Sequence, residues 1–244
     1  MAEAAHRDRL ACFFEQNPAL PLARRTFVEA IGTMLLIIAM VGSGLNVARF
    51  AANEPLVASM IVALSIAGAL VGLIVALGKV SGGHYNPIIT ISQWLSGERS
   101  RRCMFAYVFG QIVGAVIGAL VCAQMFANVP HLAPTASPTV SMLLSEVVAS
   151  TGLMTIVFGC ARSTKWETGP FAVGAWLTAG ILATPSASYA NPAVTIAAAF
   201  AAGPVALAPL TAAGYVVAQI VGMLVAMVIN RVAFDRAKSE KVSS

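Results

Sequence analysis

The stretch SYANPAVTI, residues 188–196, decides the fold, and GHYNPIITI at residues 83–91 repeats its pattern. Both copies contain Asn-Pro-x-x-Thr-Ile, and their asparagines, Asn86 and Asn191, are 105 residues apart (191 − 86). Proline has no N–H to lose and a φ suited to a helix, so it fits the first helical position, while an asparagine before it fits the N-cap. Each copy is therefore predicted to begin a helix.

Both predicted helices are short. The apolar run after Asn86 ends at about Leu95, and the run after Asn191 ends at about Ala202, where a Gly-Pro pair follows. About ten residues rise roughly 15 Å, which is half of a hydrocarbon core of about 30 Å. Half-spanning helices at matching places of two repeats indicate a membrane site built from broken helices.

The composition is that of a membrane protein. Of 244 residues, 58% are hydrophobic and 10% are charged, whereas soluble domains are about 25% charged. The net charge of +5 does not indicate a nucleic-acid partner, because the basic residues lie between apolar runs and form no stripe with aromatic residues. The four cysteines form no CxxC pair or His/Cys cluster, so we expect no disulfide framework, metal site or cofactor.

The hydropathy pattern predicts a single channel domain between two polar tails. Six spans are expected, at residues 26–45, 56–77, 104–127, 141–160, 169–184 and 207–229. The polar tails are residues 1–24 and 233–244, and the domain between them, 25–232, divides into a first repeat (about 25–127) and a second repeat (about 141–232).

The positions of the positive charges predict the topology. With six spans, and each half-helix returning to the side it came from, fourteen of the fifteen Lys and Arg residues fall on one side and only Arg49 falls on the other. Lysine and arginine favour the cytoplasmic side of a membrane. We therefore expect both termini to be cytosolic.

The internal repeat extends beyond the Asn-Pro boxes. Glu29 lies in the first span and Glu146 in the fourth, and the tetrapeptide QIVG occurs at residues 111–114 and 219–222. Small residues recur at every fourth position around each QIVG, as expected of close helix packing in lipid. With three spans in each half, the second half is inverted relative to the first, so the two half-helices meet near the midplane.

Over about residues 24–232 the chain resembles the major intrinsic protein family, the aquaporins and aquaglyceroporins. The resemblance rests on the boxes Asn86-Pro87-Ile88 and Asn191-Pro192-Ala193, on the paired glutamates and on the repeat spacing. It implies an all-α membrane protein with six transmembrane helices plus two re-entrant half-helices, arranged as an inverted repeat. It also implies a homotetramer with one pore in each subunit.

The resemblance implies a role for each polar residue of the repeat. Asn86 and Asn191 would present their amides at the pore centre, and the backbone carbonyls of residues 82–85 and 187–190 would form a ladder of acceptors. Glu29 and Glu146 would hold the two loops. Because charged groups in a membrane are costly and often functional, a proton-carrying role for these glutamates stays open. His84 would help to fix the first loop.

The resemblance also places a selectivity filter on four residues: Ile66, Ala179, Ser188 and Val194. Most members of the family carry arginine directly after the second Asn-Pro-Ala, where this chain has Val194. The expected ring is therefore wide, apolar and uncharged. Ile88, which is bulkier than alanine, would partly offset the widening at the centre.

These features predict a passive channel, and not an enzyme, for small uncharged solutes. A wide filter without arginine resembles that of bacterial aquaglyceroporins associated with arsenic resistance, which implies metalloid hydroxides such as arsenite, together with glycerol-like solutes and water, as partners. A bacterial inner membrane would be its location. One alternative is a water- or ammonia-type pore of the same fold, and another is a proton-coupled transporter that uses Glu29 and Glu146.

Overall fold

The computed structural model describes residues 15, 19–127, 137–162 and 166–233, and these are almost entirely helical. The α-helices are α2 (Leu22–Phe50), α3 (Pro55–Ser81), α4 (Pro87–Leu95), α5 (Arg101–Met125), α6 (Val140–Cys160), α7 (Gly169–Ala183), α8 (Pro192–Ala198) and α9 (Pro209–Ala233). Two 3-10 turns, η1 (Trp166–Thr168) and η2 (Gly203–Val205), precede α7 and α9. A helix therefore lies at the position of each of the six predicted spans and of both half-helices.

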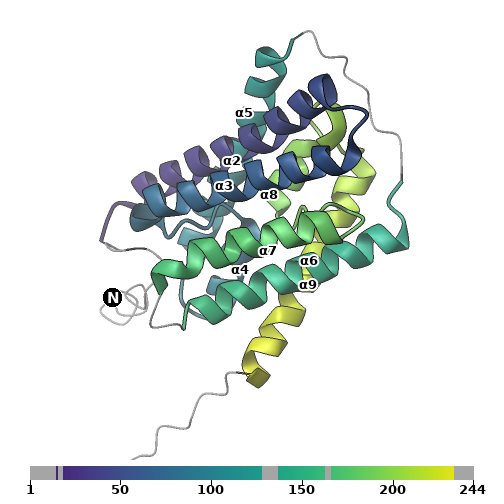
Figure 1. Ribbon diagram of the computed structural model, residues 1–244. Coiled ribbons are helices and arrows are strands. Elements are labelled where there is room, and N and C mark those ends of the chain that lie inside the picture. The colour runs from purple at the N-terminus through teal and green to yellow at the C-terminus, as the bar shows by residue number, and fades with distance from the viewer. Residues whose placement is uncertain (1–14, 16–18, 128–136, 163–165, 234–244) are drawn as a thin grey trace, which may run out of the picture.

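By length and composition, five of these helices can cross a membrane: α2, α3, α5, α6 and α9. The sixth predicted span, α7, is apolar but has only 15 residues, which rise about 22 Å. Helix α7 packs between α3 and α6, as Figure 1 shows. Most of the predicted tails, and residues 128–136 of the connector, lie outside the described residues.

The second half-helix is shorter than predicted. Helix α8 ends at Ala198 and not near Ala202, because the chain turns back there. The Leu207 N–H donates to the Ala198 carbonyl at 3.0 Å, and Gly203 supplies a left-handed turn with φ of 77°. The apolar residues beyond Ala198 therefore belong to a folded-back loop and not to the helix.

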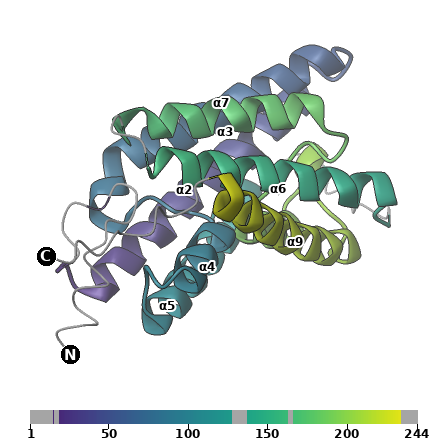
Figure 2. The ribbon, with the colours of Figure 1, turned by 90° about the horizontal axis from the view of Figure 1, so that it is seen from below.

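The two repeats pack in the same way. Helix α2 packs against α5 and α3 in the first repeat, and α6 packs against α9 and α7 in the second. Figure 1 shows α2, α3, α6 and α7 nearly parallel, with α5 and α9 crossing them steeply, and Figure 2 shows α5 and α9 together on the side away from α3 and α7. The half-helices α4 and α8 lie inside this bundle, where they touch each other.

Glycines on α5 and α9 allow the close crossings. A Cβ on Gly114 would lie 2.0 Å from the Ala30 carbonyl oxygen of α2. A Cβ on Gly222 would lie 2.6 Å from the Val147 carbonyl oxygen of α6. The small residues noted around each QIVG therefore bring backbone against backbone, as is typical of helices packed in lipid.

The bundle has a basic end. Because successive helices run in opposite directions, Arg25, Lys79, Arg101, Arg162 and Arg231 all lie at the same end, which we call the basic end. Arg49, at the last turn of α2, lies at the opposite end, which we call the far end. This arrangement matches the predicted distribution of charge.

Candidate functional site

The two Asn-Pro boxes meet at the centre of the bundle. Each asparagine is the N-cap of its half-helix, with its Oδ1 accepting from a backbone N–H: Asn86 from Ile88 at 3.1 Å, and Asn191 from Ala193 at 3.1 Å. Pro87 and Pro192 begin the two helices. The predicted helix starts are therefore confirmed in detail.

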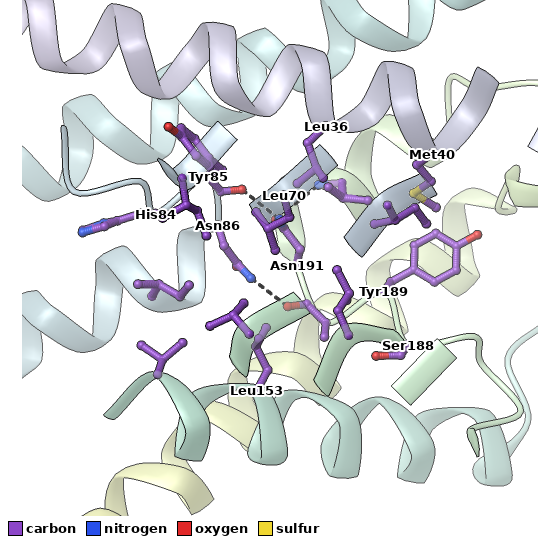
Figure 3. Close-up of a pocket in the computed structure, with 18 of the residues that line it drawn as sticks. Leu36, Met40, Leu70, His84, Tyr85, Asn86, Leu153, Ser188, Tyr189 and Asn191 are labelled. Carbon is purple, nitrogen blue, oxygen red and sulfur yellow. Dashed lines mark hydrogen bonds between the residues drawn. The ribbon is translucent and has the colours of Figure 1, made fainter. Parts of the chain in front are cut away.

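The asparagines also bond crosswise, each to the loop of the other repeat. Asn86 Nδ2 donates to the Ala190 carbonyl at 2.8 Å, and Asn191 Nδ2 donates to the Tyr85 carbonyl at 2.8 Å. Figure 3 shows these two bonds side by side in the cavity. An amide nitrogen has two donor hydrogens, so one hydrogen of each asparagine is left for a molecule in the cavity.

A buried carboxylate holds the first loop. Glu29 Oε1 accepts from Ser81 Oγ at 2.6 Å and from the His84 N–H at 3.1 Å, and Oε2 accepts from the Tyr85 N–H at 2.7 Å. Gln111 Nε2 of α5 donates to the same Oε2 at 2.7 Å. The Glu29 side chain thus receives four hydrogen bonds, and the residue is fully buried.

The second loop is held by the same four bonds. Glu146 Oε1 accepts from Ser186 Oγ at 2.5 Å and from the Tyr189 N–H at 3.0 Å. Its Oε2 accepts from the Ala190 N–H at 2.9 Å and from Gln219 Nε2 at 2.7 Å. Neither glutamate lines a cavity described below. In the structure, the two glutamates and the two glutamines act as loop clamps.

Both loops contain residues in the left-handed backbone conformation, and both line a central cavity. Positive φ angles occur at Gly82, Gly83 and Tyr85 in the first loop, and at Ala187, Ser188 and Ala190 in the second. Irregular backbone at membrane depth is tolerated where it lines a cavity. Residues 83–85 and 187–190 line the cavity as predicted, while residue 82 is not part of its wall.

The central cavity has a volume of about 60 Å³, enough for about four water-sized groups. Its polar wall is formed by the two loops and the two asparagines. Its apolar wall consists of side chains from α2, α3, α4, α6, α7 and α8: Leu36, Met40, Ile66, Leu70, Ile74, Ile89, Leu153, Val157, Val173, Leu177, Ile181 and Val194. A narrow path with hydrogen-bonding groups on one side and hydrocarbon on the other suits small amphipathic molecules.

A second cavity, of about 320 Å³, opens at the far end. Five residues line both cavities and so form the boundary between them: Met40, Ile66, Ile181, Ala187 and Tyr189. We call these residues the boundary ring. None of them carries a charge. Ile66 was predicted as a filter residue, whereas Met40 and Ile181 were missed, because only the fold reveals which face of α2 and α7 points inward.

Three of the four predicted filter residues face the central cavity, and one does not. Ile66, Ser188 and Val194 are part of its wall. Ala179 is exposed and lines neither cavity, so its predicted place in the ring is wrong; the α7 residue at the boundary ring is Ile181. Its neighbour Gly180 is buried, and a Cβ on Gly180 would lie 2.8 Å from Ser188 Oγ. Ser188 thus fills the space that a side chain at position 180 would take.

The third residues of the two boxes lie outside the path. Ile88 and Ala193 are fully buried, and neither lines the central cavity, whereas Ile89 does. Ile88 therefore does not narrow the cavity, contrary to the expectation from its size. His84 lines the cavity, and its Nδ1 lies 2.9 Å from Thr90 Oγ1. That contact ties the first loop to α4.

The sequence of the chain is similar to those of known proteins. The sequence profile of the Major intrinsic protein family matches residues 17–190. The chain is 37% identical over 213 residues to Aquaglyceroporin AqpS of Rhizobium meliloti (strain 1021), covering 86% of this chain and 90% of that protein. It is 34% identical over 92 residues to Aquaporin Z of Photorhabdus laumondii, and this match covers 37% of this chain and 38% of that protein.

The fold is similar to a solved structure. The aquaglyceroporin from Plasmodium falciparum superposes with a TM-score of 0.68 at 19% sequence identity, covering 89% of this chain and 97% of that one. At this identity the match shows the arrangement of helices alone.

Proposed function

Since the chain belongs to the major intrinsic protein family, whose aquaglyceroporins are membrane channels and not enzymes, we propose that it passes small uncharged solutes passively. Its preferred cargo is proposed to be glycerol-like polyols and metalloid hydroxides such as undissociated arsenous acid. The relative that matches over most of its length is named an aquaglyceroporin, which supports solute passage over water passage alone.

The main support for this proposal is the absence of charged side chains from the walls of the two cavities. Val194, the residue after the second Asn-Pro-Ala box, is 5% exposed and lines the central cavity. No Lys, Arg, Asp or Glu lines either cavity among the described residues. A valine in place of a guanidinium removes both bulk and a fixed cation from the constriction. The apolar wall then accepts the carbon or metalloid side of a solute, while its hydroxyls face the loops.

The polar side of the path supports neutral cargo rather than ions. The asparagine amides donate at the centre, and loop carbonyls accept on both sides of it. Such a ladder replaces the hydrogen bonds that a hydroxylic solute loses when it leaves water. It offers no carboxylate to accompany a cation. The two glutamates already receive four bonds each, which speaks against a proton-carrying role.

We further propose that the basic end faces the cytosol of a bacterial cell, because Lys and Arg favour that side. The far-end cavity then faces outward. Large apolar side chains such as Phe109, Leu64 and Val217 are exposed on the outside of the bundle, where lipid and neighbouring subunits of a homotetramer would cover them.

The experiment compares osmotic water flux with the uptake of glycerol, urea and arsenite in one preparation of proteoliposomes. We expect the wild type to pass arsenite and glycerol well above protein-free liposomes. Val194→Arg should cut solute uptake at least about tenfold, and water flux less, because a guanidinium narrows the path and binds polar groups tightly.

The matched control is Val194→Met, which adds similar length without charge. Intermediate solute uptake in this variant is expected if bulk and charge both contribute. Fast water flux with every solute excluded in the wild type would contradict the proposal. In that case Met40, Ile66 and Ile181 close the boundary ring to all but water.

A further inference from the structure

Two positively charged side chains lie inside the bundle. Arg25 of α2 and Arg99, between α4 and α5, are 7% and 4% exposed, and no other Lys or Arg is buried in the described part of the chain. Ionisable residues are costly at membrane depth, and those that occur there usually have a function. Neither arginine lines a cavity, so neither contacts a solute in the path, and any role must be exerted through their charge.

One carboxylate lies between the two arginines. Glu15 Oε1 accepts from Arg25 Nη1 at 2.9 Å, and Glu15 Oε2 accepts from Arg99 Nη2 at 2.5 Å. The Glu15 side chain is 1% exposed. We call these three side chains the charge cluster, and their net charge is +1 (2 − 1). Because the cluster is buried, water and salt screen its positive charge only weakly.

The charge cluster lies behind the wall of the path at the basic end. The Arg99 guanidinium is 6.0 Å from the centre of the Tyr107 ring, which packs edge-on against His84 with 5.5 Å between the ring centres. His84 lines the central cavity (Figure 3). Both guanidiniums are close enough for their charge to act on the His84 ring. A molecule in this part of the path is therefore exposed to the positive potential of the cluster.

The far end has no such cluster. By the spacing of the two clamp glutamates, 117 residues, the counterpart of Arg25 is Met142 (25 + 117), and by the spacing of the two asparagines, 105 residues, that of Arg99 is Pro204 (99 + 105). Both counterparts line the far-end cavity. Since each repeat has one clamp glutamate, the buried side chains of the basic end carry one more positive charge than those of the far end.

We propose that Arg25 and Arg99 determine the charge selectivity of the path, because their positive potential at the basic end excludes protons and other small cations. Glu15 holds the two guanidiniums side by side against their mutual repulsion. Fixed positive charge and the positive ends of half-helices are the electrostatic barriers that exclude cations from narrow pores. Val194 supplies no charge at the other end of the path, and without the cluster the buried carboxylate of Glu29 would favour cations near the first loop. The inference rests on the proposed function, since it assigns the selectivity of that same path.

The test measures proton permeability and glycerol uptake on the same proteoliposomes, with valinomycin and potassium holding the membrane potential at zero. Arg25→Met gives the first repeat the residue of the second and leaves Arg99 and Glu15 as a neutral pair. We expect its proton permeability to rise about tenfold, the order of effect of one weakly screened charge. Glycerol uptake should stay near that of the wild type, because Arg25 lines neither cavity.

The matched control is Glu15→Gln, which breaks the same contact with Arg25 but changes the charge in the opposite direction. It raises the net charge of the cluster to +2 (2 − 0), so its proton permeability should not exceed that of the wild type. Two further variants should also match the wild type. Arg25→Lys keeps the charge, and Arg231→Met removes a charge that is exposed at the same end of the bundle.

Two results overturn the inference and leave the channel function intact. One is wild-type proton permeability in Arg25→Met with normal glycerol uptake. The other is an equal rise in Arg25→Met and Glu15→Gln, which would assign the leak to the broken contact and not to the charge. Arg99→Gln, which also leaves a neutral pair, gives the same comparison where Arg25→Met does not fold. Absence of glycerol and arsenite uptake in the wild type overturns the proposed function itself.

Discussion

The two re-entrant loops follow the same path with different residues. The first loop takes up its left-handed turns at Gly82 and Gly83, with φ of 100° and 67°, whereas the second does so at Ala187 and Ser188, with φ of 58° and 49°. Left-handed backbone costs a non-glycine residue about 1–2 kcal/mol. The second loop is thus held against its local preference, and its strained part forms the boundary with the far-end cavity.

The difference teaches which interactions determine the loop structure. Glycine can explain the first two left-handed positions of the first loop, but not that of Tyr85 and none of those in the second loop. The bonds common to both loops include those to the buried glutamates, four in each repeat, and one crosswise bond from an asparagine amide. Strain of this kind persists only where the surroundings over-determine the backbone. The hydrogen bonds to Glu29 or Glu146 are therefore expected to stabilise the conformation of each loop more than the loop's own sequence does.

The largest effect is expected from removing a clamp. Glu29→Ala and Glu146→Ala each leave buried donors without an acceptor, which should lower the free energy of unfolding by about 3–6 kcal/mol. The two losses should be similar, since the bonds match. Thermal unfolding in detergent gives the measurement, with Glu54→Ala, at an exposed position, as the control. A properly folded Glu146→Ala channel would show that the second loop needs no clamp.

A smaller effect is expected at the helix crossings, and here the repeats should differ. Gly114→Ala places a Cβ 2.0 Å from a backbone oxygen, whereas Gly222→Ala places one at 2.6 Å. Both substitutions should lower the free energy of unfolding by about 1–3 kcal/mol through overpacking. The greater loss is expected for Gly114→Ala. Gly72→Ala, where a Cβ meets nothing within 4 Å, is the control. Equal melting temperatures for all three variants would contradict the close crossings.

The smallest effect is expected in the strained loop itself. Ala187→Gly removes the left-handed penalty but frees the unfolded chain, and the two terms nearly cancel. The melting temperature should change by no more than a few degrees, either way. A large drop on this substitution would mean that the Ala187 methyl group makes a packing contribution that the backbone conformation alone does not explain.

Much of this architecture could be predicted from the repeated motifs. The Asn-Pro boxes, the paired glutamates and QIVG each identify a residue whose partner lies in the other half of the chain, so the repeat itself carried the information. The positions of the helices followed from hydropathy, although α2 and α3 extend about five residues past their predicted ends. Helix α8 ends early, where the chain folds back and the Leu207 N–H bonds to the Ala198 carbonyl. That bond depends on how the loop folds back, which no local pattern reveals.

The side chains that line the path could be predicted less well from the sequence. Ala179 was placed in the filter by spacing alone, but it is exposed, and Ile181 is the residue of α7 that lines both cavities. Met40 and Ile181 are ordinary apolar residues in apolar helices, and only the packing shows that they face the boundary ring. Glu15 lies in a polar segment, and its contacts with Arg25 and Arg99 span up to 84 residues.

The most direct test of the central claim, a passive path for neutral solutes through two clamped loops, is glycerol uptake by proteoliposomes with and without a proton gradient. Ion current is recorded on the same preparation. The structure predicts that uptake follows the glycerol gradient alone, stays unchanged when the pH gradient and membrane potential are collapsed, and carries no proton current. Uptake that stops when the gradients are collapsed would contradict the account and assign Glu29 and Glu146 a proton-carrying role.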